Sequence, residues 1–127
     1  MQARAQAVDA PDPGAPGPEA PDPIAAMIAA GDHRDALAAC ARAHAATLGR
    51  LCMAMLGSQH DADEAVQETL LSAHRSMTGY GGEGSVRAWL CGIARHVCAR
   101  QLETRRRAAR RHRAAMHRPP AAACRRR

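Results

Sequence analysis

The segment from Ser85 to Arg113 has apolar residues at steps of three and four positions, which is the repeat of an amphipathic helix. Ser85 stands where an N-cap belongs, because its hydroxyl can accept a hydrogen bond from a free backbone N–H of the first turn. The apolar stripe consists of Val86, Trp89, Leu90, Ile93 and Val97. Arg100 falls on the same face and ends the stripe, and Arg105, Arg106, Arg107, Arg110, Arg111 and Arg113 follow. We therefore expect one long helix whose first half packs into a core and whose second half meets negative charge.

Two more helices are predicted upstream. A short apolar helix, Ile24–Ala30, ends at Gly31, and Asp32 can cap the helix that follows, which runs from about His33 to Leu56. The predicted buried face of this longer helix comprises Leu37, Ala41, His44, Leu48, Leu51 and Met55.

A fourth helix is predicted from Asp61 to about Met77, with Asp61 and Glu64 as a capping box. Its predicted buried face comprises Ala62, Val66, Thr69, Leu70, Ala73 and Met77. Asp63, Glu64, Gln67 and Glu68 lie on the other side as an acidic edge. Composition alone favours a solvated face for this edge, since acids near a helix N-terminus stabilise its dipole.

The segment from Thr78 to Gly84 contains four glycines in seven residues, so it predicts a loop. It is either a simple turn or a place where a flat or extended ligand lies against the backbone. Tyr80 is its only large side chain.

The flanking segments differ in composition from the helical part. Proline density predicts a disordered leader over residues 1–23, and Pro119-Pro120 and the terminal arginines predict a flexible basic tail over 114–127. The expected fold is therefore all-α, a small bundle of about four helices over residues 24–113.

Basic charge is concentrated near the C-terminus. All 18 basic residues are Arg, and residues 100–127 hold 11 of them against one acid, whereas residues 1–99 hold 7 against 11 acids. GC-rich coding explains the choice of Arg, but not its placement, which suits binding to phosphates.

The remaining chemistry is sparse. Five cysteines without a Cys-x-x-Cys motif do not predict a disulfide framework. Cys40 and His44 are four residues apart and could present metal ligands, but core packing is the favoured interpretation, and we predict no metal and no cofactor. The chain has no catalytic constellation and no membrane span, so we expect a cytoplasmic protein that is not an enzyme.

Several motifs in fixed order resemble region 2 of bacterial sigma-70 family factors of the extracytoplasmic-function (ECF) type. They are Gly31-Asp32 before a long helix, Leu56-Gly57, the tract from Asp61 to Glu68 (DADEAVQE), the glycine loop, and the tract from Ser85 to Arg95 (SVRAWLCGIAR). At His96 the family usually has Asn, and at Arg100 it often has Asp.

The resemblance implies two partners. The acidic helix of such factors binds the clamp helices of the largest subunit of core RNA polymerase, which would make Asp61, Glu64, Gln67 and Glu68 the polymerase contacts. The loop and long helix recognise and help melt the minus-ten element of promoter DNA. The DNA contacts would be Tyr80, Glu83, Ser85, Arg87, Arg95, His96, Arg100, Arg105, Arg106 and Arg107.

The resemblance does not extend to region 4, since only 14 residues follow Arg113. We therefore expect a region-2-only factor, a truncated product or one part of a split factor. The expected function is a sigma-like initiation factor. The alternatives are a regulator or decoy that binds polymerase or an anti-sigma factor, and an Arg-rich nucleic-acid binder without sequence preference.

Overall fold

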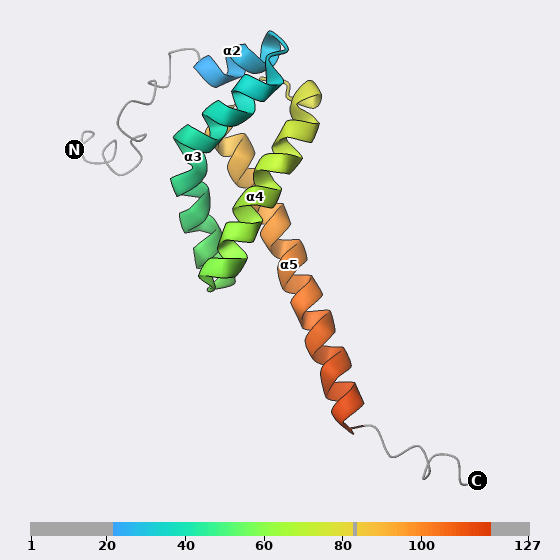
Figure 1. Ribbon diagram of the computed structural model, residues 1–127. Helices are drawn as coiled ribbons and strands as arrows, with labels where there is room; N and C mark the ends of the chain where they lie inside the picture. Colours follow the sequence, from blue (N-terminus) through green and yellow to red (C-terminus); the bar gives the residue numbers. More distant parts are fainter. Residues whose placement is uncertain (1–21, 83, 118–127) are drawn as a thin grey trace, which may run out of the picture.

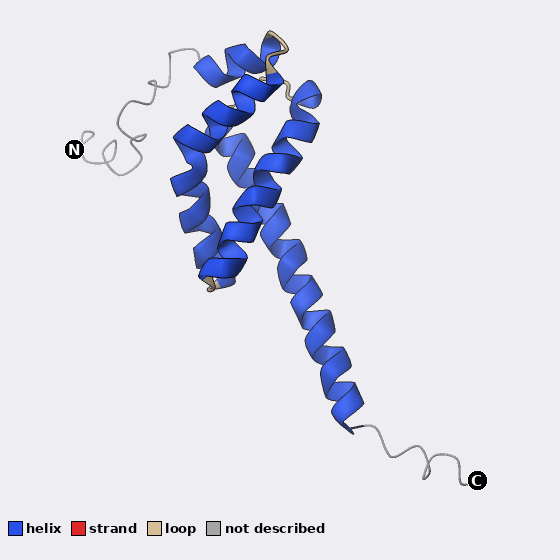
Figure 2. Cartoon of the chain, in the orientation of Figure 1, coloured by secondary structure: helices blue, strands red, loops and turns tan. Residues whose placement is uncertain are grey.

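The computed structural model describes residues 22–82 and 84–117, which form an all-α bundle with no strand in this part of the chain (Figures 1 and 2). Its elements are α2 (Pro23–Ala29), α3 (His33–Leu56), α4 (Gln59–Ser76), the 3₁₀ turn η1 (Met77–Gly79) and α5 (Val86–His117). The predicted fold class is confirmed. Most of the predicted leader and tail lie outside the described residues.

The helices α3 and α4 form a hairpin, and α5 packs against both (Figure 1). The short helix α2 lies across the end of α3 where that helix begins. Only the first half of α5 lies in the bundle, and its second half projects away from it (Figure 1).

Asp22 joins the beginnings of two helices. Its carboxylate accepts from the backbone N–H of Ile24 at 3.0 Å, which caps α2, and from the N–H of Val86 at 3.2 Å, at the start of α5. Both groups would otherwise lack an intrahelical acceptor. After α2, Gly31 adopts a left-handed φ of 87°, which confirms the predicted helix end.

The helix α3 has the predicted bounds, but its buried face is rotated from the predicted one. The buried residues are Ala36, Ala39, Cys40, Thr47, Leu48, Cys52 and Leu56. Of the predicted face only Leu48 is buried, and the others are half-buried at its margin. The prediction was wrong because the small Ala and Cys side chains, rather than the larger ones, face the neighbouring helices.

The helix α4 begins earlier than predicted, at Gln59, and the predicted capping box is wrong. Ser58 is the N-cap, and its hydroxyl accepts from the N–H of Asp61 at 3.3 Å. Asp61 therefore lies within the first turn and its carboxylate is available for other contacts. The buried residues Ala62, Ala65, Thr69 and Ala73, with Met77 in η1, largely confirm the predicted face, although Val66 and Leu70 are only half-buried.

The helix α5 starts after Ser85, whose hydroxyl accepts from the N–H of Ala88 at 3.0 Å, as predicted. Val86, Leu90, Ala94, Val97 and Cys98 are its buried residues, whereas Trp89 and Ile93 are half-buried. The helix continues to His117, past Arg113, where we expected the flexible tail to begin.

Candidate functional site

The four predicted polymerase contacts, here called the groove edge of α4, are Asp61, Glu64, Gln67 and Glu68, and they face two directions. The side chains of Glu64 and Gln67 are exposed, whereas Asp61 and Glu68 are half-buried and turn toward α5. The four residues predicted as polymerase contacts therefore lie on one stretch of α4, but only two of them face solvent freely.

An open groove of about 590 Å³ separates this edge from α5. The α4 wall is Asp61, Glu64, Gln67, Glu68 and Leu71, and the α5 wall is Val97, Arg100, Gln101, Thr104 and Arg105. The structure thus brings all four predicted polymerase contacts together with two of the predicted DNA contacts.

Ion pairs cross this groove. Arg105 pairs with Asp61 and also donates to the backbone carbonyl of Leu56 at 3.4 Å, at the end of α3. Arg100 Nη2 lies 4.0 Å from Glu68 Oε2, and Arg75 on α4 lies 3.5 Å from the same oxygen. Arginines of α5 therefore offset two of the three carboxylates on this stretch of α4, those of Asp61 and Glu68.

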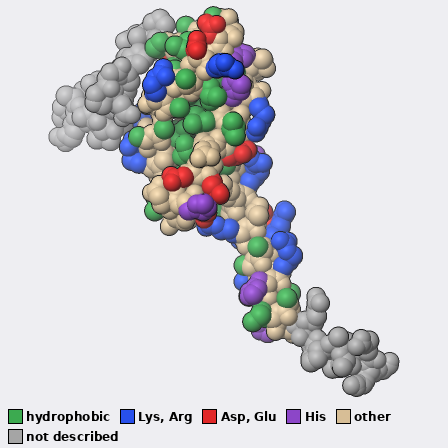
Figure 3. Space-filling model, viewed as in Figure 1, with side chains coloured by type: hydrophobic (Ala, Val, Ile, Leu, Met, Phe, Trp, Pro, Cys, Tyr) green, Lys and Arg blue, Asp and Glu red, His purple; other side chains and the backbone are tan. Residues whose placement is uncertain are grey.

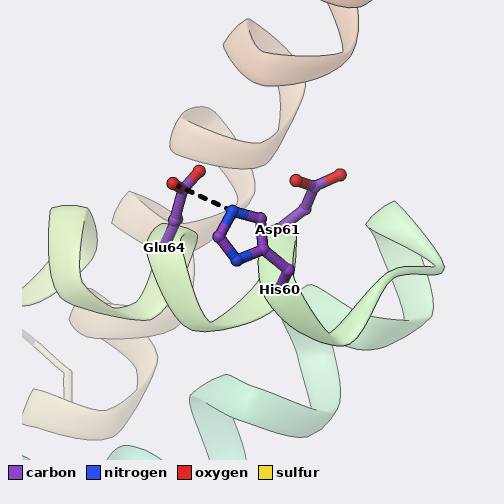
Figure 4. Close-up of side chains that lie close together, drawn as sticks. All are labelled: His60, Asp61 and Glu64. Carbon is purple, nitrogen blue, oxygen red and sulfur yellow. Dashed lines mark ion pairs between the residues drawn. The ribbon is translucent and has the colours of Figure 1, made fainter.

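His60, Asp61 and Glu64 lie close together at the start of α4, with one ligand atom from each within 4.8 Å of the others (Figure 4). His60 Nε2 is 3.4 Å from a carboxylate oxygen of Glu64. Because Asp61 already pairs with the guanidinium of Arg105, and His60 and Glu64 are exposed, we assign no metal to this cluster.

A second trough, of about 510 Å³, lies on the other side of Arg100. Trp89, Ile93, His96 and Arg100 of α5 line it, together with Ser72 and Ser76 of α4 and three more α5 residues, Ala88, Gly92 and Val97. Sequence analysis missed the two serines. Their spacing of one helical turn beside the buried Ala73 and Met77 was the available signal.

Tyr80 closes the end of the bundle near this trough. Its ring centroid lies 4.7 Å from that of Trp89, with the planes tilted by 45°, and its hydroxyl donates to the carbonyl of Gly84 at 3.2 Å. Burial, and then the negative charge of Asp22, raise the pKa of Tyr80 above its ordinary value of 10.0. Trp89 is thus a half-buried partner of Tyr80 rather than a fully buried core anchor. Glu83, also predicted as a DNA contact, lies outside the described residues.

The predicted basic contacts on α5 do not form one surface. By helical phase, Arg87 and Arg95 point to different sides of the helix from His96 and Arg100. Arg106 and Arg107 lie on the projecting half, where the space-filling view shows blue side chains below the bundle (Figure 3). The structure therefore separates these contacts into two groups. The bundle group is Arg87, Arg95, His96 and Arg100, and the projecting group includes Arg106 and Arg107.

Glu103 organises the projecting group. Its carboxylate accepts from Arg106 at 3.2 Å and from Arg107 at 3.3 Å, and it lies 3.7 Å from Arg110. Slight desolvation raises the pKa of Glu103, but the hydrogen bond from Arg106 and the charges of Arg107 and Arg110 outweigh it, so the pKa lies below the ordinary 4.5.

The cysteines behave as core side chains. Burial, with a smaller contribution from Asp22, raises the pKa of Cys40 to about 11. Burial and a hydrogen bond with Cys98 raise the pKa of Cys52 to about 12. Both thiols are fully buried, as is typical of cysteines that pack in a core. Cys124 lies outside the described residues.

Over residues 22–82 and 84–117, no helix is both long and apolar enough to cross a membrane. The longest helix, α5, carries arginines through its second half.

Part of this chain is similar to a known protein family and to two known proteins. The family described as Sigma-70 region 2 matches residues 40–108, from within α3 to the projecting half of α5. No solved structure gives a significant match.

Two curated relatives are the ECF RNA polymerase sigma factors SigG of Mycobacterium tuberculosis strains CDC 1551 / Oshkosh and ATCC 25618 / H37Rv. Each is 50% identical to this chain over 56 residues, which cover 44% of this chain and 15% of the relative. The match thus spans a small part of the relatives' length. Since the Sigma-70 region 2 family covers more than half of the chain, including the groove and the trough, the chain belongs to the sigma-70 family through its region 2.

Proposed function

We propose that this chain is a sigma-like transcription initiation factor that binds core RNA polymerase and promoter DNA. The observation that carries the proposal is the region 2 match, which spans α4, the loop and most of α5. Proteins of this family are transcription factors rather than enzymes, in agreement with the expectation from the sequence.

The exposed part of the groove edge is the proposed polymerase contact. Glu64 and Gln67 are accessible, and Asp61 and Glu68 lie beside them along the groove. Carboxylate and amide groups on one helical edge complement a basic surface, and the clamp helices of the largest polymerase subunit are the proposed partner. A cytoplasmic location follows from this proposal.

The trough beside Trp89 is the proposed contact for the opened minus-ten strand. Trp89, which is in tilted contact with Tyr80, offers aromatic surface, Ser72 and Ser76 offer hydroxyls, and Arg100 offers positive charge. Unstacking a base costs a few kcal/mol, which stacking and edge hydrogen bonds must offset. In this proposal Ser85, Arg87 and Arg95, near the start of α5, contact the phosphate backbone of the DNA.

A second candidate is a regulator that occupies polymerase, or an anti-sigma factor, without directing initiation. The observation that favours it is the engagement of Arg100 and Arg105 by acids of α4, which leaves fewer free cations for DNA.

The test of the polymerase contact is the affinity of the full chain for core RNA polymerase. The triple variant Glu64→Ala, Gln67→Ala, Glu68→Ala should bind at least about tenfold more weakly, because it loses two charged groups and an amide at the interface. The control is Asp63→Ala with His74→Ala, which alters exposed residues of α4 that do not line the groove.

Circular dichroism must give equal helix content for both variants and the wild type. Equal polymerase affinity of the triple variant and the wild type would refute the polymerase contact. Transcription from a promoter fork by the reconstituted complex then separates initiation from the regulator alternative.

A further inference from the structure

Three of the four cysteines within the described residues gather between α3 and α5. Cys52 of α3 and Cys98 of α5 are fully buried, and a hydrogen bond joins their thiols. Cys91 lies two turns before Cys98 on the same side of α5, is half-buried, and interacts electrostatically with Cys52. From this arrangement we infer that Cys52 and Cys98 are a reversible dithiol–disulfide pair, and that Cys91 is the thiol through which small disulfides react with it.

The packing of α3 on α5 favours a bond between Cys52 and Cys98. A disulfide needs Cα atoms within about 7 Å and Cβ atoms that point toward each other. The hydrogen bond between the two thiols shows that these side chains point toward each other. Ala94 lies one turn before Cys98 and is also fully buried, and small side chains of this kind allow two helices to approach closely. Cys40, about three turns earlier on α3, lies outside this group.

Burial makes the pair slow to react on its own. It raises the pKa of Cys52 to about 12, with smaller contributions from the hydrogen bond with Cys98 and from Cys91. Since the thiolate is the attacking form of cysteine, a buried thiol with a raised pKa reacts slowly. Cys91 is more accessible than either buried thiol, so it forms the first covalent bond.

The reaction is a series of three thiol–disulfide exchanges with a small disulfide, RSSR. Cys91 attacks RSSR, forms a mixed disulfide and releases one RSH. Cys52 then attacks the sulfur of Cys91 and releases the second RSH. Cys98 attacks the sulfur of Cys52, which returns Cys91 to its thiol form. In sum, two protein thiols and RSSR give one protein disulfide and two RSH, so atoms and electrons balance.

The disulfide would join α3 to the packed half of α5. It closes a long loop that includes α4 and the glycine loop, which lowers the conformational entropy of the unfolded chain. The oxidised chain should therefore unfold at a temperature at least about 5 °C higher than the reduced chain. This redox device lies in the core, and the inference does not rest on the proposed function.

The test equilibrates the full chain in buffers with different ratios of oxidised to reduced glutathione. Every protein in the series carries Cys124→Ala, which removes the fifth cysteine of the sequence. After free thiols are alkylated, peptide mapping by mass spectrometry should find one disulfide, between Cys52 and Cys98. The variants Cys52→Ala and Cys98→Ala should lack it, and they should also lack the rise in unfolding temperature.

Two further variants separate the entry thiol from the pair. Cys91→Ala should reach the same equilibrium between dithiol and disulfide, but at least about tenfold more slowly, because the accessible thiol is gone. The matched control is Cys40→Ala, which removes a buried thiol of α3 outside the group and should change neither the rate nor the equilibrium.

The outcomes that contradict the inference are specific. If Cys52 and Cys98 of the folded chain stay reduced at every glutathione ratio, or form a disulfide only in urea, the dithiol pair is refuted. If Cys91→Ala reacts as fast as the parent protein, Cys91 is not the entry thiol. Circular dichroism before oxidation shows that each variant is folded. The assay contains no polymerase and no DNA, so failure here leaves the proposed function standing.

Discussion

At the scale of single residues, small side chains govern this protein. The buried faces consist largely of Ala and Cys, and the few large buried residues include Leu48, Leu90 and Met77. Small side chains bury little apolar area each, so backbone conformation contributes a larger share of the stability than in a Leu-rich core. The glycines of α3 illustrate this, because one lies mid-helix and one ends the helix.

Alanine at Gly49 and at Gly57 should change stability in opposite directions. Gly49 lies inside α3, and a Cβ there meets no heavy atom within 4 Å, so Gly49→Ala should raise the free energy of unfolding by about 0.5–1 kcal/mol. Gly57 has a φ of 73°, so Gly57→Ala should lower it by about 1 kcal/mol. Urea unfolding followed by circular dichroism measures both, and the same sign at the two sites would contradict the prediction.

At the scale of helices, α5 has two halves that are stabilised differently. The half within the bundle buries Val86, Leu90 and Val97, whereas from Thr104 to His117 every residue is exposed. A short exposed helix is marginal without packing, so the ion pairs of Glu103 with the following arginines matter locally.

Acid should weaken the projecting half of α5 through Glu103. Because the folded pKa of Glu103 is lowered, its stabilisation is present above the ordinary 4.5 and is lost as the pH falls through the folded value. Circular dichroism of the wild type should therefore show a loss of helix in acid that the Glu103→Gln variant lacks. Other carboxylates titrate in both proteins, so the difference between the two curves isolates Glu103. Coincident curves would contradict the prediction.

At the scale of the whole molecule, α2, α3, α4 and the first half of α5 form one packed body, from which the second half of α5 projects as a basic rod (Figure 1). Tertiary contacts hold α3, α4 and the first half of α5 together, and none of the contacts that define the core reaches past Leu102. The two parts therefore differ in local stability rather than in secondary structure.

Hydrogen exchange should divide α5 in two. Amides of residues 90–98 should exchange slowly, because they open only with the bundle, whereas amides of 106–117 should exchange many times faster through local fraying. Mass spectrometry of exchanged peptides resolves the two halves. Equal protection along α5 would mean that a partner or a second copy covers the rod.

Much of this architecture was predictable from the sequence, and the errors have identifiable causes. The fold class and the bounds of α3 are confirmed, because long helical periodicity is a strong signal. The start of α4 was missed because the N-cap is Ser58 rather than Asp61. The buried face of α3 was missed because hydrophobicity gave weight to Leu37 and Leu51 over the smaller Ala36 and Cys40.

The candidate site was less predictable than the fold. Sequence patterns placed the acidic edge and the arginines on separate helices, but the packing of α4 on α5 decides that Asp61 meets Arg105. Contacts of this kind depend on the rotation of two helices about their axes, which a period alone does not fix. The roles of these residues in binding remain predictions.

The double use of Asp22 has a kinetic consequence. Its carboxylate links the start of α2 to the first N–H of α5, and the second of these hydrogen bonds spans 64 positions of the chain. Contacts between distant positions form late, since they require a large loop to close first. We therefore expect the hydrogen bonds of Asp22 to form late in folding. They should slow unfolding while leaving the folding rate nearly unchanged.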